Sequence, residues 1–146
     1  MYLDSAIIVK LLVDEPDSAA IAGGLVGHSL SSSELAVPEV FSALLRKERD
    51  KHINSTQRAE AWRAFNERLG LRDIVLHPIS SVLLKKANHV LERCHPAVPL
   101  RTLDAIHTAA CDLSQDFPLC TTDKRMRDAA AILGIPLFPE TETSPS

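Results

Sequence analysis

Glycine is scarce in this sequence, and so are the sequence patterns of common nucleotide-binding and acyl-transfer proteins. The 146 residues include five glycines, and none of them falls in a GxGxxG or P-loop pattern. This absence disfavours a nucleotide-binding Rossmann or P-loop protein. A GxSxG elbow is also missing, as is a cysteine with a positioned histidine, so nothing indicates acyl transfer.

Cysteines and long apolar runs are few as well. Cys94, Cys111 and Cys120 form no CxxC pair, and we expect free buried thiols rather than a disulfide framework. No apolar run approaches the ~20 residues that cross a bilayer, which predicts a soluble protein with no membrane partner. The N-terminus has neither a basic region nor a small-residue cleavage site, so we expect no secretory signal and a cytoplasmic location.

Positive charge is not in excess either. A net charge of -3 gives no basic surface of the kind that nucleic-acid-binding domains usually carry. Taken alone, this charge counts against nucleic acid as a partner. An acidic site that binds divalent cations would lower the formal charge of the chain and still present positive charge to a phosphate. The charge therefore leaves a nucleic-acid partner open.

Short apolar segments alternate with amphipathic ones along the chain. The predicted strands cover residues 2–4, 30–32, 74–76, 119–122 and 135–138. Helical periodicity predicts helices over 6–13, 18–26, 55–69, 81–94, 103–113 and 123–133. This alternation indicates a three-layer α/β/α sandwich with a short-stranded, mostly parallel central sheet. We expect one domain over residues 1–138 and a disordered tail over 139–146, which is rich in Thr, Ser, Pro and Glu.

One further helix is predicted after the second strand. Ser31-x-x-Glu34 fits a capping box, and apolar residues then repeat at helical spacing from Val37 toward Lys51. Pro38 indicates either that the regular helix begins near this residue or that the helix is kinked, since proline is tolerated in a first turn.

Acidic residues fall at the ends of several predicted elements. Asp4 ends the first strand, Asp123 follows the 119–122 strand, and Asp104 lies in the first turn of a helix. In parallel sheets ligands bind beyond the carboxyl ends of the strands, so Asp4 and Asp123 share one edge of the sheet. Each aspartate alone has an ordinary explanation, because Asp often caps a helix N-terminus.

Glu39 and Glu34 compete for a fourth acidic position. They lie about 140° apart on a helix, so we do not expect them to serve one site together. Glu34 already has a predicted capping role, and Glu39 has a solvated surface position as its ordinary explanation. We therefore favour Glu39 as the acid that faces the other three.

Four short segments contain all of these acids. They are Leu3-Asp4-Ser5, residues 32–40 (SSELAVPEV), residues 103–110 (LDAIHTAA) and Thr121-Thr122-Asp123. In this order they resemble the motifs of PIN-domain proteins, and most of all those of VapC-type toxins. The resemblance extends from Leu3 to about Phe138, and the LDAIHTAA and TTD segments are its most specific parts.

The resemblance implies a PIN-like fold and a metal-dependent endoribonuclease that hydrolyses RNA phosphodiester bonds. It further implies that the protein is the toxin of a toxin–antitoxin pair, with a VapB-like antitoxin and a homodimeric state. The acids that match the metal-binding positions are Asp4, Glu39, Asp104 and Asp123. Oxygen ligands alone select hard cations, which agrees with Mg²⁺ or Mn²⁺ and disfavours zinc.

Other residues match or adjoin these positions. Ser5 and Thr122 correspond to positions that often support the site, although many relatives carry an aromatic residue immediately before the last acid. Lys10, Arg101 and Arg125 lie near the acids in sequence and are candidates for phosphate contacts.

His107 lies three residues after Asp104, inside an apolar, alanine-rich helix. We interpret it as a packed core residue and assign it no part in catalysis. Aromatic residues make up only 4% of the chain, so extensive base stacking is not expected to determine which RNA is bound.

Three alternatives remain beside the toxin. One is a housekeeping PIN-type nuclease that processes RNA, and another is a catalytically inactive PIN-fold protein-binding module. A receiver-like domain that holds Mg²⁺ for phosphorylation is disfavoured, because such a domain needs adjacent N-terminal acids and Asp4 is followed by Ser5.

Overall fold

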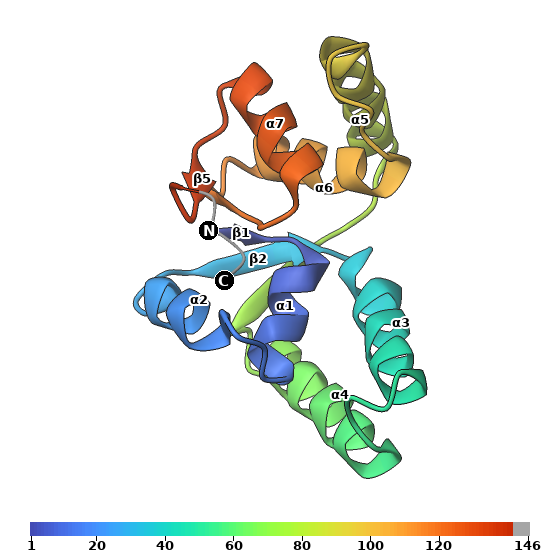
Figure 1. Cartoon of the computed structure of the whole chain (residues 1–146). Coiled ribbons are helices and arrows are strands. Elements are labelled where there is room, and N and C mark those ends of the chain that lie inside the picture. Colours follow the sequence, from blue (N-terminus) through green and yellow to red (C-terminus); the bar gives the residue numbers. More distant parts are fainter. Residues whose placement is uncertain (142–146) are drawn as a thin grey trace.

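The computed structural model describes residues 1–141 and has a five-stranded sheet at its centre (Figure 1). Its strands are β1 (Tyr2–Leu3), β2 (Leu30–Ser33), β3 (Ile74–His77), β4 (Leu119–Cys120) and β5 (Leu137–Phe138). They are arranged in the order β3-β2-β1-β4-β5, and every neighbouring pair is parallel. The first strand of the sequence is therefore the central strand of the sheet.

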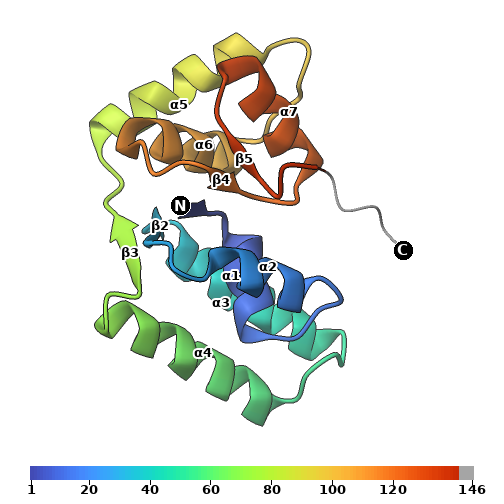
Figure 2. The ribbon, with the colours of Figure 1, turned by 90° about the vertical axis from the view of Figure 1, so that its left-hand side faces the viewer.

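Helices cover both faces of this sheet, as Figures 1 and 2 show from two directions. On one side lie α1 (Ser5–Leu12), α2 (Ser18–Leu25), α3 (Ala36–Arg49) and α4 (Ser55–Gly70). On the other lie α5 (Ser81–Cys94), α6 (Thr102–Ser114) and α7 (Lys124–Leu133). The predicted three-layer α/β/α sandwich with a short-stranded parallel sheet is confirmed.

The two residues of β1 connect the two helical layers. Successive side chains of a strand point to opposite faces, so Tyr2 packs in the core beneath α5–α7 and Leu3 in the core beneath α1–α4. Both side chains are fully buried. Because β1 is covered on both faces, its two residues are held in place even though the strand is very short.

Most predicted helices agree with the structure to within two residues. The 81–94 segment forms α5 with the predicted bounds, and Asp123 is the N-cap of α7. Gly134 ends α7 with a φ of 71°, a left-handed conformation that glycine adopts without steric cost. The last two strands are shorter than predicted, because only Leu119–Cys120 and Leu137–Phe138 pair with neighbours.

The capping box predicted at Ser31 and Glu34 is wrong. Ser31 belongs to β2, and α3 begins only at Ala36, with Leu35 as an N-cap residue that makes no side-chain capping bond. Glu34 is exposed in the turn between the two elements. Pro38 is the third residue of α3, a first-turn position where its missing N–H leaves no bond unmade.

The remaining expectations about the chain concern its cysteines, its tail and membranes. The three cysteines are free and buried, as predicted. Within residues 1–141 no helix is both long and apolar enough to span a bilayer. Of the predicted tail, the carbonyls of Pro139 and Glu140 accept hydrogen bonds from Arg127, and residues 142–146 lie outside the described residues.

Candidate active site

Asp4 lies immediately after the central strand, where it is the N-cap of α1. Its Oδ1 accepts a hydrogen bond from the backbone N–H of Ile7 at 2.9 Å, and its Oδ2 accepts one from the Thr121 hydroxyl. The residue is only 4% exposed. Burial raises the pKa of the Asp4 carboxyl although both hydrogen bonds favour its charged form.

Asp123 occupies the equivalent position after β4. Its Oδ1 caps α7 by accepting from the N–H of Met126 at 2.9 Å, and its own N–H donates to Thr121 Oγ1 at 3.1 Å. Thr121 therefore links Asp4 to Asp123. Since β1 and β4 are parallel neighbours, both aspartates lie at the carboxyl edge of the sheet, where parallel sheets bind ligands.

Asp104 reaches the same region from the first turn of α6. Its Oδ2 is buried and has no hydrogen-bond partner within residues 1–141. A cation lies 3.9 Å from it, the Nε of Arg101, whose side chain is 70% exposed. Burial, followed by repulsion from Asp123, raises the pKa of the Asp104 carboxyl. A buried carboxylate oxygen with no hydrogen-bond donor is unusual, and it indicates that a further ligand belongs there.

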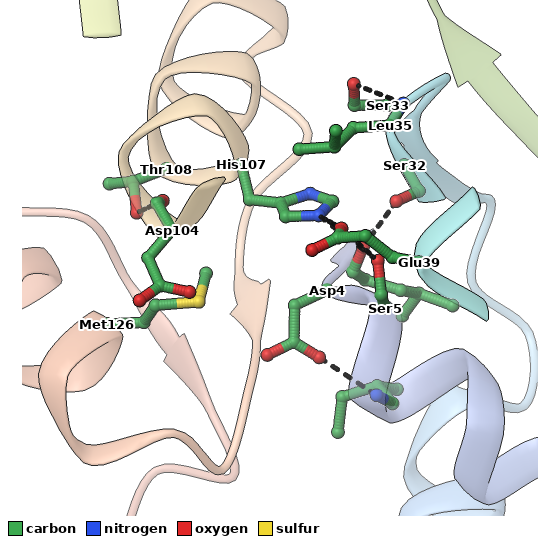
Figure 3. A network of polar contacts seen from close by, with 12 residues as sticks. Asp4, Ser5, Ser32, Ser33, Leu35, Glu39, Asp104, His107, Thr108 and Met126 are labelled. Atoms are coloured by element: carbon green, nitrogen blue, oxygen red, sulfur yellow. Dashed lines mark hydrogen bonds and ion pairs between the residues drawn. The ribbon is translucent and has the colours of Figure 1, made fainter. Parts of the chain in front are cut away.

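Glu39 comes from the first turn of α3 and faces Asp4 and Asp104 (Figure 3). Its Oε1 accepts a hydrogen bond from Ser5 Oγ at 2.6 Å and lies 2.5 Å from Nε2 of His107. Burial alone would raise the pKa of Glu39, but the bonds to His107 and Ser5 outweigh it and lower that pKa. This acid is therefore held ionised, whereas burial disfavours the charged forms of Asp4 and Asp104.

The other predicted residues differ in how closely they approach the acids. Ser5 bonds to Glu39, whereas the half-buried Thr122 makes no side-chain hydrogen bond within the described part of the chain. Arg101 and Arg125 are exposed beside the site. Lys10 is engaged elsewhere, since its Nζ pairs with carboxylates of the turn that follows α1.

Two residues at the site were missed or misread at the level of sequence. His107 is buried, as predicted, but its imidazole bonds to Glu39 and not only to core residues. Its position three residues after Asp104 could have indicated this, because residues i and i+3 lie on the same side of a helix. Thr121 bonds to Asp4, and no local pattern distinguishes it from Thr122.

The four acids fit a divalent cation by their chemistry. They supply only carboxylate oxygens, the ligand atoms that Mg²⁺ and Mn²⁺ prefer, and Oδ2 of Asp104 has no hydrogen bond within residues 1–141. Within residues 1–141 no three His, Cys, Asp or Glu side chains lie close enough together to surround a metal ion. Carboxylates repel one another unless a cation neutralises them. We therefore expect the four acids to lie further apart without a bound cation than with one.

Comparisons with known proteins agree with this geometry. Residues 1–132 match the family described as the PIN domain. The chain is also 41% identical over 140 residues to a protein of Mycobacterium tuberculosis (strain ATCC 25618 / H37Rv) named Ribonuclease VapC46, and the match covers 92% of this chain and 93% of that protein. On these similarities, and with an acidic site at the carboxyl edge of a parallel sheet, the chain belongs to the PIN-domain family.

Proposed function

We propose that this protein is a metal-dependent endoribonuclease and the toxin of a toxin–antitoxin pair. The observation that carries the proposal is the group of four carboxylates, Asp4, Glu39, Asp104 and Asp123, which four separate elements bring to one edge of the sheet. The similarity to a protein named Ribonuclease VapC46 over nearly the full length of both chains supports the same function.

The acids would hold Mg²⁺ or Mn²⁺, and each has a distinct structural setting. Asp4 and Asp123 are fixed by their capping bonds, so their positions follow the ends of β1 and β4. Asp104 offers an Oδ2 that has no hydrogen bond within residues 1–141, and Glu39 is held ionised by its two donors. A bound divalent cation would supply an activated water and neutralise charge on the phosphate.

Hydrolysis of this kind requires the RNA phosphate to lie against the acids. Arg101 and Arg125 are exposed at the start of α6 and α7, the two helices that carry Asp104 and Asp123 at their N-termini. Helix N-termini favour anions, and these arginines would add positive charge for the RNA backbone. The products would carry 5'-phosphate and 3'-hydroxyl ends, because this route does not use the ribose 2'-hydroxyl.

The proposal extends to partners and location. We propose a VapB-like antitoxin that masks the acids, a homodimeric state, and activity in the cytoplasm, where RNA and antitoxin are both available. Residues 1–138 would form the nuclease domain.

The test is cleavage of structured RNA by the purified protein, freed of antitoxin, with Mg²⁺ or Mn²⁺. A chelator and the Asp4→Asn and Asp104→Asn variants provide the controls. Loss of cleavage with the chelator and in both variants would establish the metal-dependent nuclease. Intact RNA under every condition, together with no metal binding by calorimetry, would contradict the proposal and favour an inactive PIN-fold binding module.

A further inference from the structure

His107 is a buried imidazole with hydrogen bonds at both ring nitrogens. Its Nδ1 lies 2.7 Å from the Tyr2 hydroxyl, and its Nε2 lies 2.5 Å from Oε1 of Glu39 and 3.2 Å from Oγ of Ser5. The ring is 2% exposed and packs edge-on against the Tyr2 ring, with centroids 5.8 Å apart. Rotation of the imidazole is therefore restricted by packing on one side and by hydrogen bonds at both ends.

The partners of the two nitrogens determine which one carries the proton. An ionised carboxylate only accepts hydrogen bonds, so the short contact with Glu39 requires a proton on Nε2. In the neutral ring Nδ1 is then an acceptor, and the Tyr2 hydroxyl is the donor that fills it. Burial raises the pKa of Tyr2, so this hydroxyl keeps its proton. Tyr2 thus selects the tautomer in which His107 donates to Glu39.

This chain of bonds leaves the two oxygens of Glu39 in different states. Oε1 receives two donors, Nε2–H of His107 and the Ser5 hydroxyl. Oε2 has no hydrogen bond within residues 1–141. A glutamate at the surface of a helix otherwise samples several rotamers, and two fixed donors on one oxygen restrict it to one. The carboxylate is therefore oriented with one oxygen held and the other free.

The network also connects elements from both helical layers. His107 and Asp104 belong to α6, Glu39 belongs to α3, and Ser5 begins α1 (Figure 3). Tyr2 lies in β1. A residue needed only to fill the core would not require two hydrogen bonds, since an apolar side chain of similar size packs without buried polar groups. The series of hydrogen bonds from Tyr2 through His107 ends instead on Glu39, which faces Asp4 and Asp104.

We propose that His107 is a positioning residue, fixed as the Nε2–H tautomer by Tyr2, which orients Glu39 so that Oε2 alone is presented to the divalent ion. This inference rests on the proposed metal-dependent function. It assigns no proton transfer to His107 and gives Tyr2 a role beyond packing. Hydrogen bonds of this type behind a metal ligand typically change metal affinity or activity by about 10- to 100-fold.

The test uses Tyr2→Phe, His107→Gln and His107→Ala, with Ser31→Ala as the matched control. Tyr2→Phe keeps the shape of the ring and removes the hydroxyl that fills Nδ1. Gln places an amide N–H near the position of Nε2–H, whereas Ala leaves Glu39 without that donor. Ser31 also carries a buried hydroxyl that bonds to a carboxylate, Asp116 at 2.6 Å, but outside this network.

The first readout does not involve metal or RNA. Nitrogen-15 NMR of the metal-free protein reports which nitrogen of His107 is protonated, and we expect Nε2–H in the unmodified protein. A ring protonated at Nδ1 alone would overturn the inference. In Tyr2→Phe we expect this tautomer preference to weaken.

The second readout is Mn²⁺ affinity, measured by calorimetry at fixed pH. We expect a loss of about 10- to 100-fold in Tyr2→Phe and His107→Ala, a smaller loss in His107→Gln, and no change in Ser31→Ala. With RNA, the losses should appear in kcat more than in KM. Should His107→Ala fail to fold, the other two variants decide the matter.

The outcomes separate this inference from the proposed function. Unchanged Mn²⁺ affinity in folded Tyr2→Phe and His107→Gln would overturn the positioning role even if the protein cleaves RNA. If the unmodified protein does not cleave RNA but Tyr2→Phe still weakens Mn²⁺ binding, the positioning role is supported and the nuclease function is contradicted.

Discussion

The acids at the carboxyl edge of the sheet differ from those in the turn between α1 and α2. In that turn, Glu15 lies 3.3 Å from Lys10 and 3.7 Å from Lys47, and Asp17 lies 2.9 Å from Lys10. Glu15 and Asp17 therefore each have a lysine partner. At the sheet edge, the basic side chains that contact the acids are the imidazole of His107, 2.5 Å from Glu39, and the exposed guanidinium of Arg101, 3.9 Å from Asp104.

The difference distinguishes an acidic site from an acidic surface. Paired surface acids and lysines neutralise each other, and such pairs contribute little to stability. Burial of acids with few basic groups beside them disfavours their charged forms, as the raised pKa values of Asp4 and Asp104 indicate. A sequence retains such a group when something else is to be bound there. The comparison therefore points to the sheet edge, and not to the turn between α1 and α2, as the metal-binding region.

The largest expected effect is on catalysis. Asp4→Asn and Asp104→Asn should each lower the rate of RNA cleavage by about 100-fold or more, since a metal supplies several kcal/mol of transition-state stabilisation. Asp17→Asn removes an acid of similar exposure to Glu39 and should leave the rate unchanged. Cleavage assays at saturating Mn²⁺ compare the three. An equal loss in Asp17→Asn would refute the contrast between the two acidic regions.

The next effect is the stabilisation that a metal provides. Mn²⁺ at 100 times its Kd should raise the free energy of unfolding by about 2.7 kcal/mol, and a chelator should reverse the change. Thermal unfolding with and without Mn²⁺ measures it. In Asp104→Asn the increase should be strongly reduced, because the carboxylate that offers Oδ2 to the metal is replaced by a neutral amide. An undiminished increase in that variant would place the metal away from Asp104.

A smaller effect is the dependence of the free energy of unfolding on pH. Between the ordinary pKa of 3.8 and the raised values of Asp4 and Asp104, the folded protein binds more protons than the unfolded chain. Its stability should therefore fall as pH rises through that window, by at most about 1.4 kcal/mol per pH unit for each proton.

The contribution of Glu39 to the pH dependence of stability has the opposite sign, because its pKa is lowered. Its stabilising contribution is present above its ordinary pKa of 4.5 and is lost as pH falls through the lowered value. Unfolding of the chelated protein between about pH 4 and about pH 7 should show a flatter slope in Asp4→Asn than in the unmodified protein. An identical slope would mean that Asp4 does not titrate in this window.

The smallest effect is expected from the ion pairs between Lys10 and the turn that follows α1. Lys10→Met removes two ion pairs, and each such pair contributes less than about 1 kcal/mol. RNA affinity should not change, because Lys10 is already engaged by Glu15 and Asp17. Binding to RNA in the presence of a chelator measures this directly. A weaker affinity with a reduced salt dependence would instead assign Lys10 a phosphate contact.

Local patterns were sufficient to predict most elements of the fold. The apolar period of residues 81–94 and the glycine at 134 predict the bounds of α5 and the end of α7, because both signals depend on neighbouring residues only. The prediction of a capping box at Ser31 failed because β2 pairs with one strand on each side, β1 and β3. Ser31 to Ser33 are buried in the sheet, and that pairing outweighs a local cap.

Glu39 was predicted in preference to Glu34 because Glu34 was expected to cap a helix, and that reason was wrong. Glu34 makes no side-chain capping bond, and it is exposed because the turn after β2 points it toward solvent. Glu39 faces the aspartates because α3 packs against α1, where Ser5 meets it. The angle between the two glutamates could be derived from helical geometry, but which of them faces inward depended on helix packing.

By itself, the sequence determined the fold class and predicted the four acids, since strand and helix periods and the short motifs around the acids are local properties. Only the tertiary structure decided what holds those acids in place. Tyr2 and His107 are 105 residues apart, and Asp4 and Thr121 are 117 residues apart. Such contacts form because β1 is inserted between β2 and β4, and no pattern of neighbouring residues records which distant hydroxyl or imidazole the fold will bring to a carboxylate.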